Sequence, residues 1–500
     1  MNHPPPEATR PAATPRHAAA VILVRHPRDP EIYWVQRQPH LTFLGGFHSF
    51  PGGRLDKGDD PAVYGLGAAF DDAPLRFCAL RELYEETGVL IGGRFVDIPD
   101  FITGVKTGVL TPDLSALMPA GRWVTPPFSP ARFDTTFYLA WLPEGPEPVA
   151  FAGELAFGEW IRPEAALERW NEGRALLAPP TLYAIRGLCA AVLMASGNDE
   201  PLELAMAAEQ LTGSEEANGG PVTRIEMRPG FFLFPMKTRT LPPATHTNAF
   251  LVGGASLVLV DPGSDDPGEI ERLLQFIDRL GGEGRSVTEI WLTHQHPDHV
   301  GGVAVVASRL GVPVRAHPLT ATRLAGLGVP IEPVLEDDLV RELPGRPGWR
   351  LRVVHTPGHA VGHLAFFEEV SGTLIAGDMV SGVGWIMIDP PEGEMAPYLD
   401  SLRRLAGLGA SALFPSHGPP TTGVVDRLEA YLAHRLEREA KVVGALKGGQ
   451  ARSIEDILAD VYDDVAPDRL GLARRSLLSH LIKLESEGSV ISRGEMWQWR

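Results

Sequence analysis

A short histidine-rich run constrains this chain more than any other stretch of its sequence. Residues 293–302 read THQHPDHVGG and follow the largely apolar run 289–292, which has the pattern of a buried strand at its end. Side chains two positions apart point the same way in an extended chain, so His294 and His296 can hold one cation while Asp298 and His299 turn toward a second. Imidazole nitrogens and carboxylate oxygens bind zinc at about 2.0–2.2 Å. The run therefore predicts a close pair of metal ions.

Three residues further along the chain extend this pattern. Each follows an apolar run and stands beside a glycine, where backbone and metal can approach closely: His359, Asp378 and His417. A solvated histidine-rich loop is the ordinary explanation of an isolated His-x-His pair, but it does not account for these later residues.

Together these residues resemble the metallo-beta-lactamase superfamily over roughly residues 222–425. The resemblance implies two zinc ions and an αββα sandwich of two sheets between helices. The implied ligand sets are His294, His296 and His359 for one ion and Asp298, His299 and His417 for the other, with Asp378 bridging the two. Asp261, at the end of another apolar run, is predicted to orient a ligand or the neighbouring backbone.

Length and composition limit the possible classes of protein. Five hundred residues predict two or three domains, and a formal net charge of -18 argues against broad affinity for nucleic acid, while leaving a local basic groove open. The first sixteen residues are rich in Pro and Ala and lack a secretory signal. With no evident apolar run of membrane-spanning length, we expect a cytoplasmic protein without a membrane partner. Cys78 and Cys189 are expected to be buried free thiols.

A second group of acids lies in the N-terminal half, in the sequence RELYEETGVL from Arg81. On a helix Glu82, Glu85 and Glu86 share one face, where like charges repel by a few tenths of a kcal/mol per pair unless a cation binds. The alternative is an amphipathic surface helix with a solvated acidic face. Glu154, further along, is a candidate for an additional ligand.

These acids, together with the glycine-rich run 46–53, resemble the Nudix box. Asp59 stands where a Glu is usual, and residues 60–80 form a longer insertion than the motif has, as in the subgroup related to peroxisomal coenzyme A diphosphatases. The resemblance implies an α/β/α sandwich in which Mg²⁺ or Mn²⁺, held by the three glutamates, bridges a diphosphate. It also implies that Arg81 holds the loop by pairing with an acid, for which Asp59 is the candidate.

The predicted organisation is an α/β multidomain chain. Its parts are a disordered leader (1–16), a Nudix-like domain (17–195), a polar, glycine-rich linker (196–221), a metallo-beta-lactamase-like domain (222–425) and a helix followed by a winged helix (426–500). This C-terminal order resembles the beta-lactamase-like family that includes a mitochondrial endoribonuclease. Its basic side chains could approach a phosphate backbone, or the extension could serve as a packing lid: Arg474, Arg475, His480 and Lys483.

The function we predict is that of a metal-dependent hydrolase with two sites, whose catalytic candidates are Asp298, Glu82 and Glu85. One site is a dinuclear zinc hydrolase for phosphodiester or thioester and ester bonds. The other is a Nudix-type hydrolase of nucleoside diphosphate derivatives, with coenzyme A as one candidate. The alternative is a single-stranded RNA endonuclease, or an RNA-binding protein whose Nudix half only binds nucleotide. The sequence assigns no substrate-binding residues and no oligomeric state.

Overall fold

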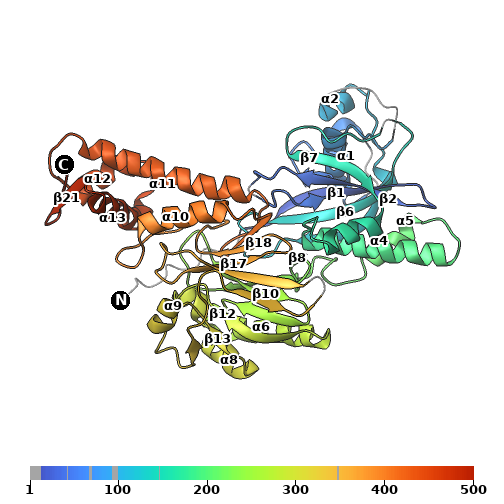
Figure 1. The fold of residues 1–500 in the computed structure, drawn as a ribbon. Coiled ribbons are helices and arrows are strands. Elements are labelled where there is room, and N and C mark those ends of the chain that lie inside the picture. Colours follow the sequence, from blue (N-terminus) through green and yellow to red (C-terminus); the bar gives the residue numbers. More distant parts are fainter. Residues whose placement is uncertain (1–12, 42, 67–69, 93–99, 146, 346–347) are drawn as a thin grey trace. The chain divides into compact units, whose positions relative to one another are not determined.

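The computed structural model describes residues 13–41, 43–66, 70–92, 100–145, 147–345 and 348–500. The chain forms two compact units that divide between Leu233 and Phe234 (Figure 1). Of the predicted leader, residues 1–12 lie outside the described part, and the first strand already begins at Arg16.

The first unit is built on one mixed sheet. Its strands are β1 (Arg16–Arg25), β2 (Glu31–Arg37), β3 (His48–Ser49), β4 (Gly52–Arg54), β5 (Met118–Val124), β6 (Phe133–Trp141) and β7 (Leu155–Ile161). The order is β3-β2-β1-β6-β5, with β4 paired to β1 and β7 to β2. The central strands β1 and β6 run parallel, and such strands are normally buried on both faces.

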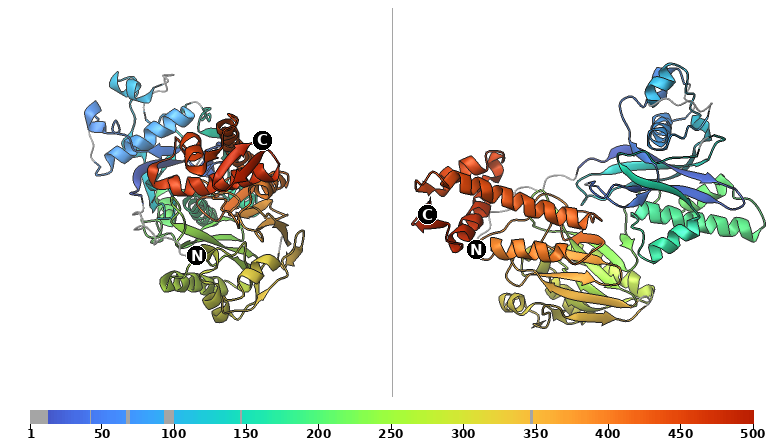
Figure 2. Two further views of the ribbon diagram at one scale, coloured as in Figure 1. Left: turned by 90° about the vertical axis from the view of Figure 1, so that its left-hand side faces the viewer. Right: turned by 45° about the horizontal axis from the view of Figure 1, so that its top comes forward.

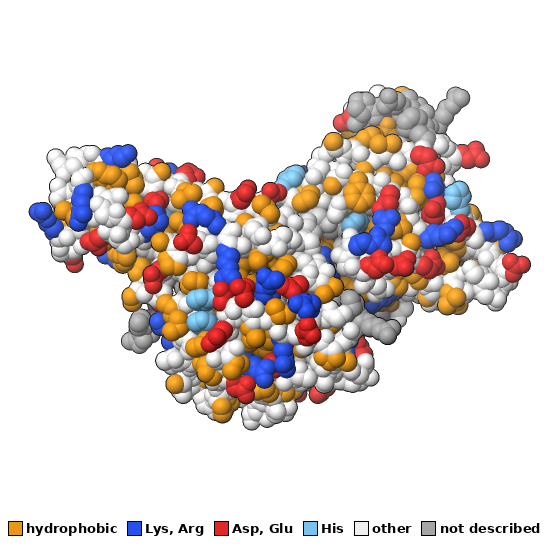
Figure 3. Space-filling view, viewed as in Figure 1, with side chains coloured by type: hydrophobic (Ala, Val, Ile, Leu, Met, Phe, Trp, Pro, Cys, Tyr) orange, Lys and Arg blue, Asp and Glu red, His pale blue; other side chains and the backbone are white. Residues whose placement is uncertain are grey.

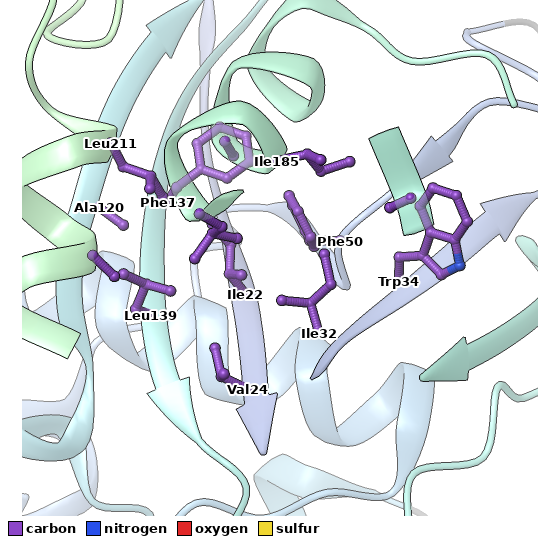
Figure 4. Close-up of a cluster of buried hydrophobic side chains, with 14 of the residues drawn as sticks. Ile22, Val24, Ile32, Trp34, Phe50, Ala120, Phe137, Leu139, Ile185 and Leu211 are labelled. Carbon is purple, nitrogen blue, oxygen red and sulfur yellow. The ribbon is translucent and has the colours of Figure 1, made fainter. Parts of the chain in front are cut away.

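Successive side chains of β1 enter two separate cores. Ile22 and Val24 pack beneath α3 (Pro163–Asn171), α4 (Pro179–Gly197) and α5 (Leu204–Leu211), as Figure 4 shows for part of this cluster. Val21 and Leu23 face α1 (Ala73–Thr87) and α2 (Phe101–Lys106) on the other side. The predicted α/β/α sandwich is confirmed, because the period-2 alternation of a strand places apolar residues on both faces of the sheet.

The stretch 196–221 is not the linker that its polar, glycine-rich sequence predicts. It contains α5, and its apolar side chains Leu202, Ala207 and Leu211 belong to the first unit's core. Figure 4 labels Leu211 within this cluster. The polar residues lie in the turns on either side of this short amphipathic helix, so composition alone hid it. The division between units falls inside β9 (Phe231–Lys237), not at residue 222.

Two smaller expectations also need correction. By length and composition α4 could span a membrane, and its Leu182, Ile185 and Leu188 are buried in the first unit's core. The rest of α4 is also rich in apolar residues, and Leu193 and Met194 among them are exposed. Both cysteines are free, but only Cys78 is fully buried, while Cys189 is partly exposed.

The second unit contains two facing sheets, and the chain just before the division at Phe234 supplies the last strands of one of them. The first has seven strands in the order β14-β13-β12-β11-β10-β9-β8, and the second has five in the order β15-β16-β17-β18-β19. The strands of the first, besides β9, are β8 (Glu226–Arg228), β10 (His246–Gly253), β11 (Ser256–Val260), β12 (Ser286–Trp291), β13 (Val314–Arg315) and β14 (Ile331–Glu332). Those of the second are β15 (Val340–Leu343), β16 (Trp349–His355), β17 (Leu364–Glu368), β18 (Thr373–Gly377) and β19 (Ala412–Pro415).

Helices cover the outer faces of both sheets. On the first lie α6 (Pro267–Gly282) and α8 (Val303–Leu310), and on the second α10 (Met395–Ala406) and α11 (Val424–Leu446), which run side by side (Figures 1 and 2). The predicted αββα sandwich is therefore confirmed. Shorter helices are α7 (Pro297–Val300), α9 (Pro318–Arg323) and the 3-10 turns Pro61–Tyr64, Leu114–Ala116 and Pro467–Arg469.

The C-terminal part has the predicted winged-helix order. After α11 come β20 (Arg452–Ser453), α12 (Ile454–Val461), α13 (Leu470–Ser486), β21 (Val490–Arg493) and β22 (Met496–Trp499). Leu477, Leu481 and Leu484, spaced along one side of α13, are buried in a core of their own with Val442 and Leu446 of α11. This shared core makes α11 part of both the sandwich and the winged helix.

Candidate metal centre

The predicted metal ligands lie together in the second unit, just after the ends of four strands. The run His294–His299 follows β12, His359 follows β16, Asp378 directly follows β18, and His417 follows β19. At Gly377 the chain takes a φ of +54°, and a Cβ there would lie 2.4 Å from Nε2 of His363. Glycine is therefore required where β18 turns into the site.

Three histidines converge as one candidate site. Nδ1 of His296 lies 2.9 Å from Nε2 of His294 and 2.9 Å from Nε2 of His359. These nitrogens form one of the groups whose ligand atoms all lie within 4.8 Å of one another. Nitrogens gathered in this way match the donor set that a tetrahedral zinc ion uses.

A second site lies beside the first. Oδ2 of Asp298 is 3.6 Å from Nε2 of His417 and 3.9 Å from Nε2 of His299. The carboxylate of Asp378 stands between the two groups, because its Oδ1 is 3.3 Å from Nε2 of His417 and its Oδ2 is 3.5 Å from Nε2 of His359. Each oxygen of Asp378 thus faces a different site.

Hydrogen bonds on the far side of the rings fix the orientation of the histidines. Nδ1 of His299 lies 2.8 Å from Oδ2 of Asp261, Nδ1 of His359 is 2.9 Å from the Met387 carbonyl, and Nδ1 of His417 is 2.9 Å from the His246 carbonyl. Since carbonyls and carboxylates accept hydrogen bonds, each Nδ1 carries a proton, which leaves Nε2 as the ring nitrogen that faces the centre.

Asp261 and His363 support the surrounding backbone. Asp261 accepts hydrogen bonds from the backbone N–H of Thr293 at 2.9 Å and from the Thr293 hydroxyl at 2.5 Å. His363 is fully buried, and its Nε2 accepts the backbone N–H of Asp378 at 3.0 Å. His363 therefore holds the backbone at Asp378 and is not a member of the converging groups.

The protonation states of this centre suit a cation. Burial lowers the pKa of His294 well below its usual value and that of His359 to about 4, so both are neutral, the form that binds metal. Burial also disfavours a charged His299, but the carboxylates of Asp378 and Asp298 outweigh it and raise the pKa of His299. A metal ion would compete with that proton.

Two buried polar atoms of the centre have no hydrogen-bond partner in the described part of the chain. They are Nε2 of His299 and Oδ1 of Asp378. A buried polar atom without a partner costs about 1–3 kcal/mol, and a cation coordinated by both atoms would remove this cost. The residues present therefore fit a pair of divalent ions.

Metal removal should consequently destabilise the second unit. An ion present at 100 times its Kd stabilises the native state by about 2.7 kcal/mol, so we expect stripping with a chelator to lower the melting temperature and zinc to restore it. Differential scanning calorimetry of protein with measured metal content tests this. Mg²⁺, which prefers oxygen ligands, should restore less. An identical melting curve for metal-free and zinc-loaded protein would contradict the assignment.

In the first unit, the predicted pairing of Arg81 is present. Nε and Nη2 of Arg81 lie 2.7 and 2.8 Å from the two carboxylate oxygens of Asp59, whose side chain is fully buried. Gly53 is also constrained, since a Cβ there would lie 2.4 Å from the carboxyl carbon of Glu82. The backbone of the glycine loop at Gly53 is thus packed directly against the carboxylate of Glu82 on α1.

The three glutamates of α1 do not gather around one point. Nη1 of Arg81 lies 2.9 Å from Glu82 and 3.0 Å from Glu85, whereas Glu86 accepts the backbone N–H of Gly52 at 3.0 Å. Within the described residues, the groups of three converging ligand atoms all lie in the second unit. The guanidinium of Arg81 thus pairs with two of the carboxylates that were predicted to bind a metal ion.

Burial nevertheless sets Glu86 apart from a solvated surface acid. Burial raises the pKa of Glu86 to about 8, with the Gly52 N–H acting against it and the carboxylates of Glu82 and Glu154 making smaller contributions in the same direction as burial. Glu154 itself lies 3.2 Å from Nη2 of Arg37. The solvated amphipathic helix is therefore wrong for Glu86, and a buried carboxylate of this kind is stabilised in its charged form by a nearby cation.

Sequence reasoning missed the backbone carbonyls of Met387 and His246 that orient two of the histidines. No sequence signal identifies them, because any residue supplies the same carbonyl and only the folded chain decides which one is near. It also missed Thr247, whose hydroxyl is 3.4 Å from Oδ2 of Asp298.

Fold and site together define a class of protein: a chain of two α/β units, the second of which gathers histidines and carboxylates that fit divalent cations. Three segments of the chain match models of known protein families. Residues 242–417 match the metallo-beta-lactamase superfamily, residues 453–499 the beta-lactamase associated winged helix domain, and residues 94–188 the NUDT19 Nudix domain. The chain thus carries a metallo-beta-lactamase domain and the associated winged helix domain in its second unit and a Nudix domain in its first, and these domains indicate a metal-dependent hydrolase. The Nudix match begins after the glutamates of α1.

Individual proteins are similar over parts of the chain. Beta-lactamase-like protein 2 homolog of Caenorhabditis elegans is 26% identical over 256 residues, which cover 51% of this chain and 83% of that protein. A metallo-beta-lactamase family protein from Thermus thermophilus is 28% identical over 54% of this chain and 99% of its own, with a TM-score of 0.44. A NUDIX hydrolase from Alicyclobacillus acidocaldarius is 29% identical over 38% of this chain and 98% of its own, with a TM-score of 0.32.

Proposed function

We propose that the second unit is a dinuclear zinc hydrolase acting on phosphodiester or thioester and ester bonds. The observation that carries this proposal is the position of Asp378, whose two carboxylate oxygens face two separate ligand groups. A structural zinc site is normally closed by four protein ligands around one ion, and a bridging carboxylate between two sites is the arrangement of hydrolytic metal pairs.

The donor atoms favour zinc. Histidine nitrogens make up the whole of the first group and most of the second, with Asp298 and Asp378 supplying oxygen. Imidazole suits zinc, copper, iron and nickel, whereas magnesium and calcium prefer oxygen. Hydrolysis involves no change of oxidation state, and zinc undergoes none.

The protein side chains would prepare and confine the reaction. A pair of divalent cations held here supplies a nucleophile from water near neutral pH and polarises the bond under attack. Asp378 and His299 are buried and hold their ligand atoms in place, while Asp298 keeps 14% of its side chain exposed. Asp298 is thus the more exposed of the two carboxylates of the centre, since Asp378 keeps 9% of its side chain exposed.

For the substrate, the contacts of the C-terminal extension favour a small molecule over a long RNA. The basic residues predicted to approach phosphate lie against carboxylates: Arg474 on Glu455, Arg475 on Asp389 and Lys483 on Glu439. His480 is fully buried beside Glu439. Acidic and basic side chains are also interspersed over the face drawn in Figure 3. The pairing of these basic residues and the net charge of -18 support thioesters, esters or small phosphodiesters as the substrates.

For the first unit we propose Nudix-type hydrolysis of a nucleoside diphosphate derivative with Mg²⁺ or Mn²⁺. Buried Glu86, the contact of Gly53 with Glu82, and the Arg81–Asp59 pair support it. In this proposal the ion binds Glu82, Glu85 and Glu86 after the Arg81 contacts to Glu82 and Glu85 give way.

A substrate panel on the full chain tests both proposals at once. Asp298→Ala should abolish thioester, ester or phosphodiester hydrolysis and leave diphosphate hydrolysis intact, and Glu85→Gln should do the reverse. We expect losses of at least about 10²-fold, the usual effect of removing a group that holds a catalytic ion or positions a reacting water. Activities that survive both substitutions would overturn the two assignments.

A further inference from the structure

The loop that follows Asp378 contacts three of the candidate ligands. It spans residues 379–389 and begins at the bridging carboxylate itself. The backbone N–H of Gly382 donates to the His417 carbonyl at 2.6 Å. The Met387 carbonyl accepts from Nδ1 of His359 at 2.9 Å. The loop therefore makes main-chain hydrogen bonds to a ligand residue of each site.

One face of α11 holds this loop through its backbone. Arg427, Tyr431 and Arg435 are spaced by four residues, so they lie on the same side of the helix. The Tyr431 hydroxyl accepts the backbone N–H of Ser381 at 2.9 Å and lies 2.9 Å from the Gly384 carbonyl.

The two arginines of this face also donate to loop carbonyls. Nη2 of Arg427 donates to the carbonyl of Ser381, and Nη2 of Arg435 to that of Ile386. Arg435 is 3% exposed. Burying a guanidinium costs free energy unless its hydrogen bonds are made. The bond to the Ile386 carbonyl therefore offsets part of the cost of burying Arg435. Each of the three side chains reaches main-chain atoms of the loop.

Ring stacking adds a further contact between loop and helix. Trp385 lies at the centre of the loop, stacked on His434 of α11 with ring centroids 3.8 Å apart and planes 8° from parallel. Trp385 is half exposed, so its packing on α11 is not a consequence of burial in a core.

The winged helix holds the other end of the loop. Nε of Arg475, on α13, lies 2.6 Å from Oδ1 of Asp389. Arg435 also reaches α13, with Nη1 3.4 Å from the Ser476 hydroxyl. The same guanidinium therefore contacts the loop and the winged helix. Both α11 and α13 lie outside residues 242–417, the part that matches the metallo-beta-lactamase superfamily.

We propose that Arg427, Tyr431 and Arg435 are positioning residues of the metal centre, through which the C-terminal extension sets the geometry of both ion sites. The inference rests on the proposed dinuclear function. Its physical basis is that the loop has main-chain bonds to His359 and His417 on one side and to the α11 residues on the other. Releasing the α11 side lets the ligands turn away from the ions.

The test uses Tyr431→Phe in the full-length chain, which keeps the ring and removes only the hydroxyl. Cobalt(II) titration followed by its visible absorption bands reports affinity and coordination, and a chelator competition gives the zinc affinity. We expect roughly tenfold weaker binding and altered bands, within the range found for residues that support metal ligands. Arg435→Lys should behave in the same direction, because it keeps the charge but loses the planar fork.

A matched control is Arg438→Lys, one turn further along α11. Arg438 binds the Val461 carbonyl at 2.7 Å and Asp464 at 2.8 Å and makes none of the loop contacts described above. It should leave the cobalt bands and zinc affinity unchanged. Melting curves of the metal-free proteins separate stability from positioning, since a role confined to packing would lower the melting temperature of Tyr431→Phe without moving the bands.

The outcomes separate this inference from the function on which it rests. Wild-type cobalt affinity and bands in both Tyr431→Phe and Arg435→Lys would overturn the inference and leave the proposed hydrolase standing. Failure of the wild-type chain to bind transition metal would overturn the proposed function itself. Should Tyr431→Phe not fold, the comparison of Arg435→Lys with Arg438→Lys decides the matter in the same way.

Discussion

Replacing Asp378 with asparagine should lower hydrolysis by the second unit about 10³-fold or more, which corresponds to a loss of about 4 kcal/mol in transition-state stabilisation. Asparagine keeps the shape of the side chain but removes its charge and turns one oxygen into an N–H donor. Oδ1 and Oδ2 lie near Nε2 of His417 and Nε2 of His359, so one of the two sites would face a donor where it needs an acceptor. Metal analysis should show a loss of bound ion in parallel.

The matched control is Asp400→Asn, the same change at an exposed acid of the same unit. Asp400 lies 2.7 Å from Nη1 of Arg403 on α10, with 78% of its side chain exposed. Exposed ion pairs contribute at most about 1 kcal/mol, so this variant should keep its metal and its rate. Full activity and metal content in Asp378→Asn would contradict the bridging role.

Replacing Asp59 with asparagine should destabilise the first unit by about 1.5–3 kcal/mol, the usual cost of losing hydrogen bonds to a charged group, because Arg81 keeps its contacts with Glu82 and Glu85 but loses its buried partner. Asp59 and Arg81 keep 0% and 8% of their side chains exposed and form a two-point pair. Asparagine cannot neutralise the guanidinium. Hydrogen exchange followed by mass spectrometry in rising urea measures this, because peptides from β1 and β6 report the first unit alone.

Asp56→Asn serves as the control for that loop. Asp56 pairs with Arg54 at 2.8 Å, but both side chains are about half exposed. Its loss should cost less than about 1 kcal/mol. Equal exchange in the two variants would show that the Asp59–Arg81 pair does not hold the glycine loop on α1.

Much of the second unit could be predicted from local sequence. The strand before the histidine-rich run ends at Trp291, close to where it is predicted, and the C-terminal part has the predicted order of a helix followed by a winged helix. Hydrophobic periodicity and glycine stops are local signals, so they remain readable without the rest of the chain.

Predictions from the spacing of residues failed where one side chain could pair with several others. The glutamates of α1 lie on one face as predicted, yet Arg81 contacts two of them while also holding Asp59. The spacing could not show that one guanidinium would serve three carboxylates. Likewise, the polar composition of 196–221 concealed the apolar face of α5.

The sequence by itself determined which side chains can bind metal, because few residue types supply nitrogen or carboxylate donors and here they stand at strand ends beside glycines. Only the tertiary structure decided how those donors are aimed. That depends on main-chain groups such as the Met387 carbonyl and on distant residues such as Arg435, brought there by α11. A backbone carbonyl is chemically the same at every position, so its part in the site arises only when the chain has folded around it.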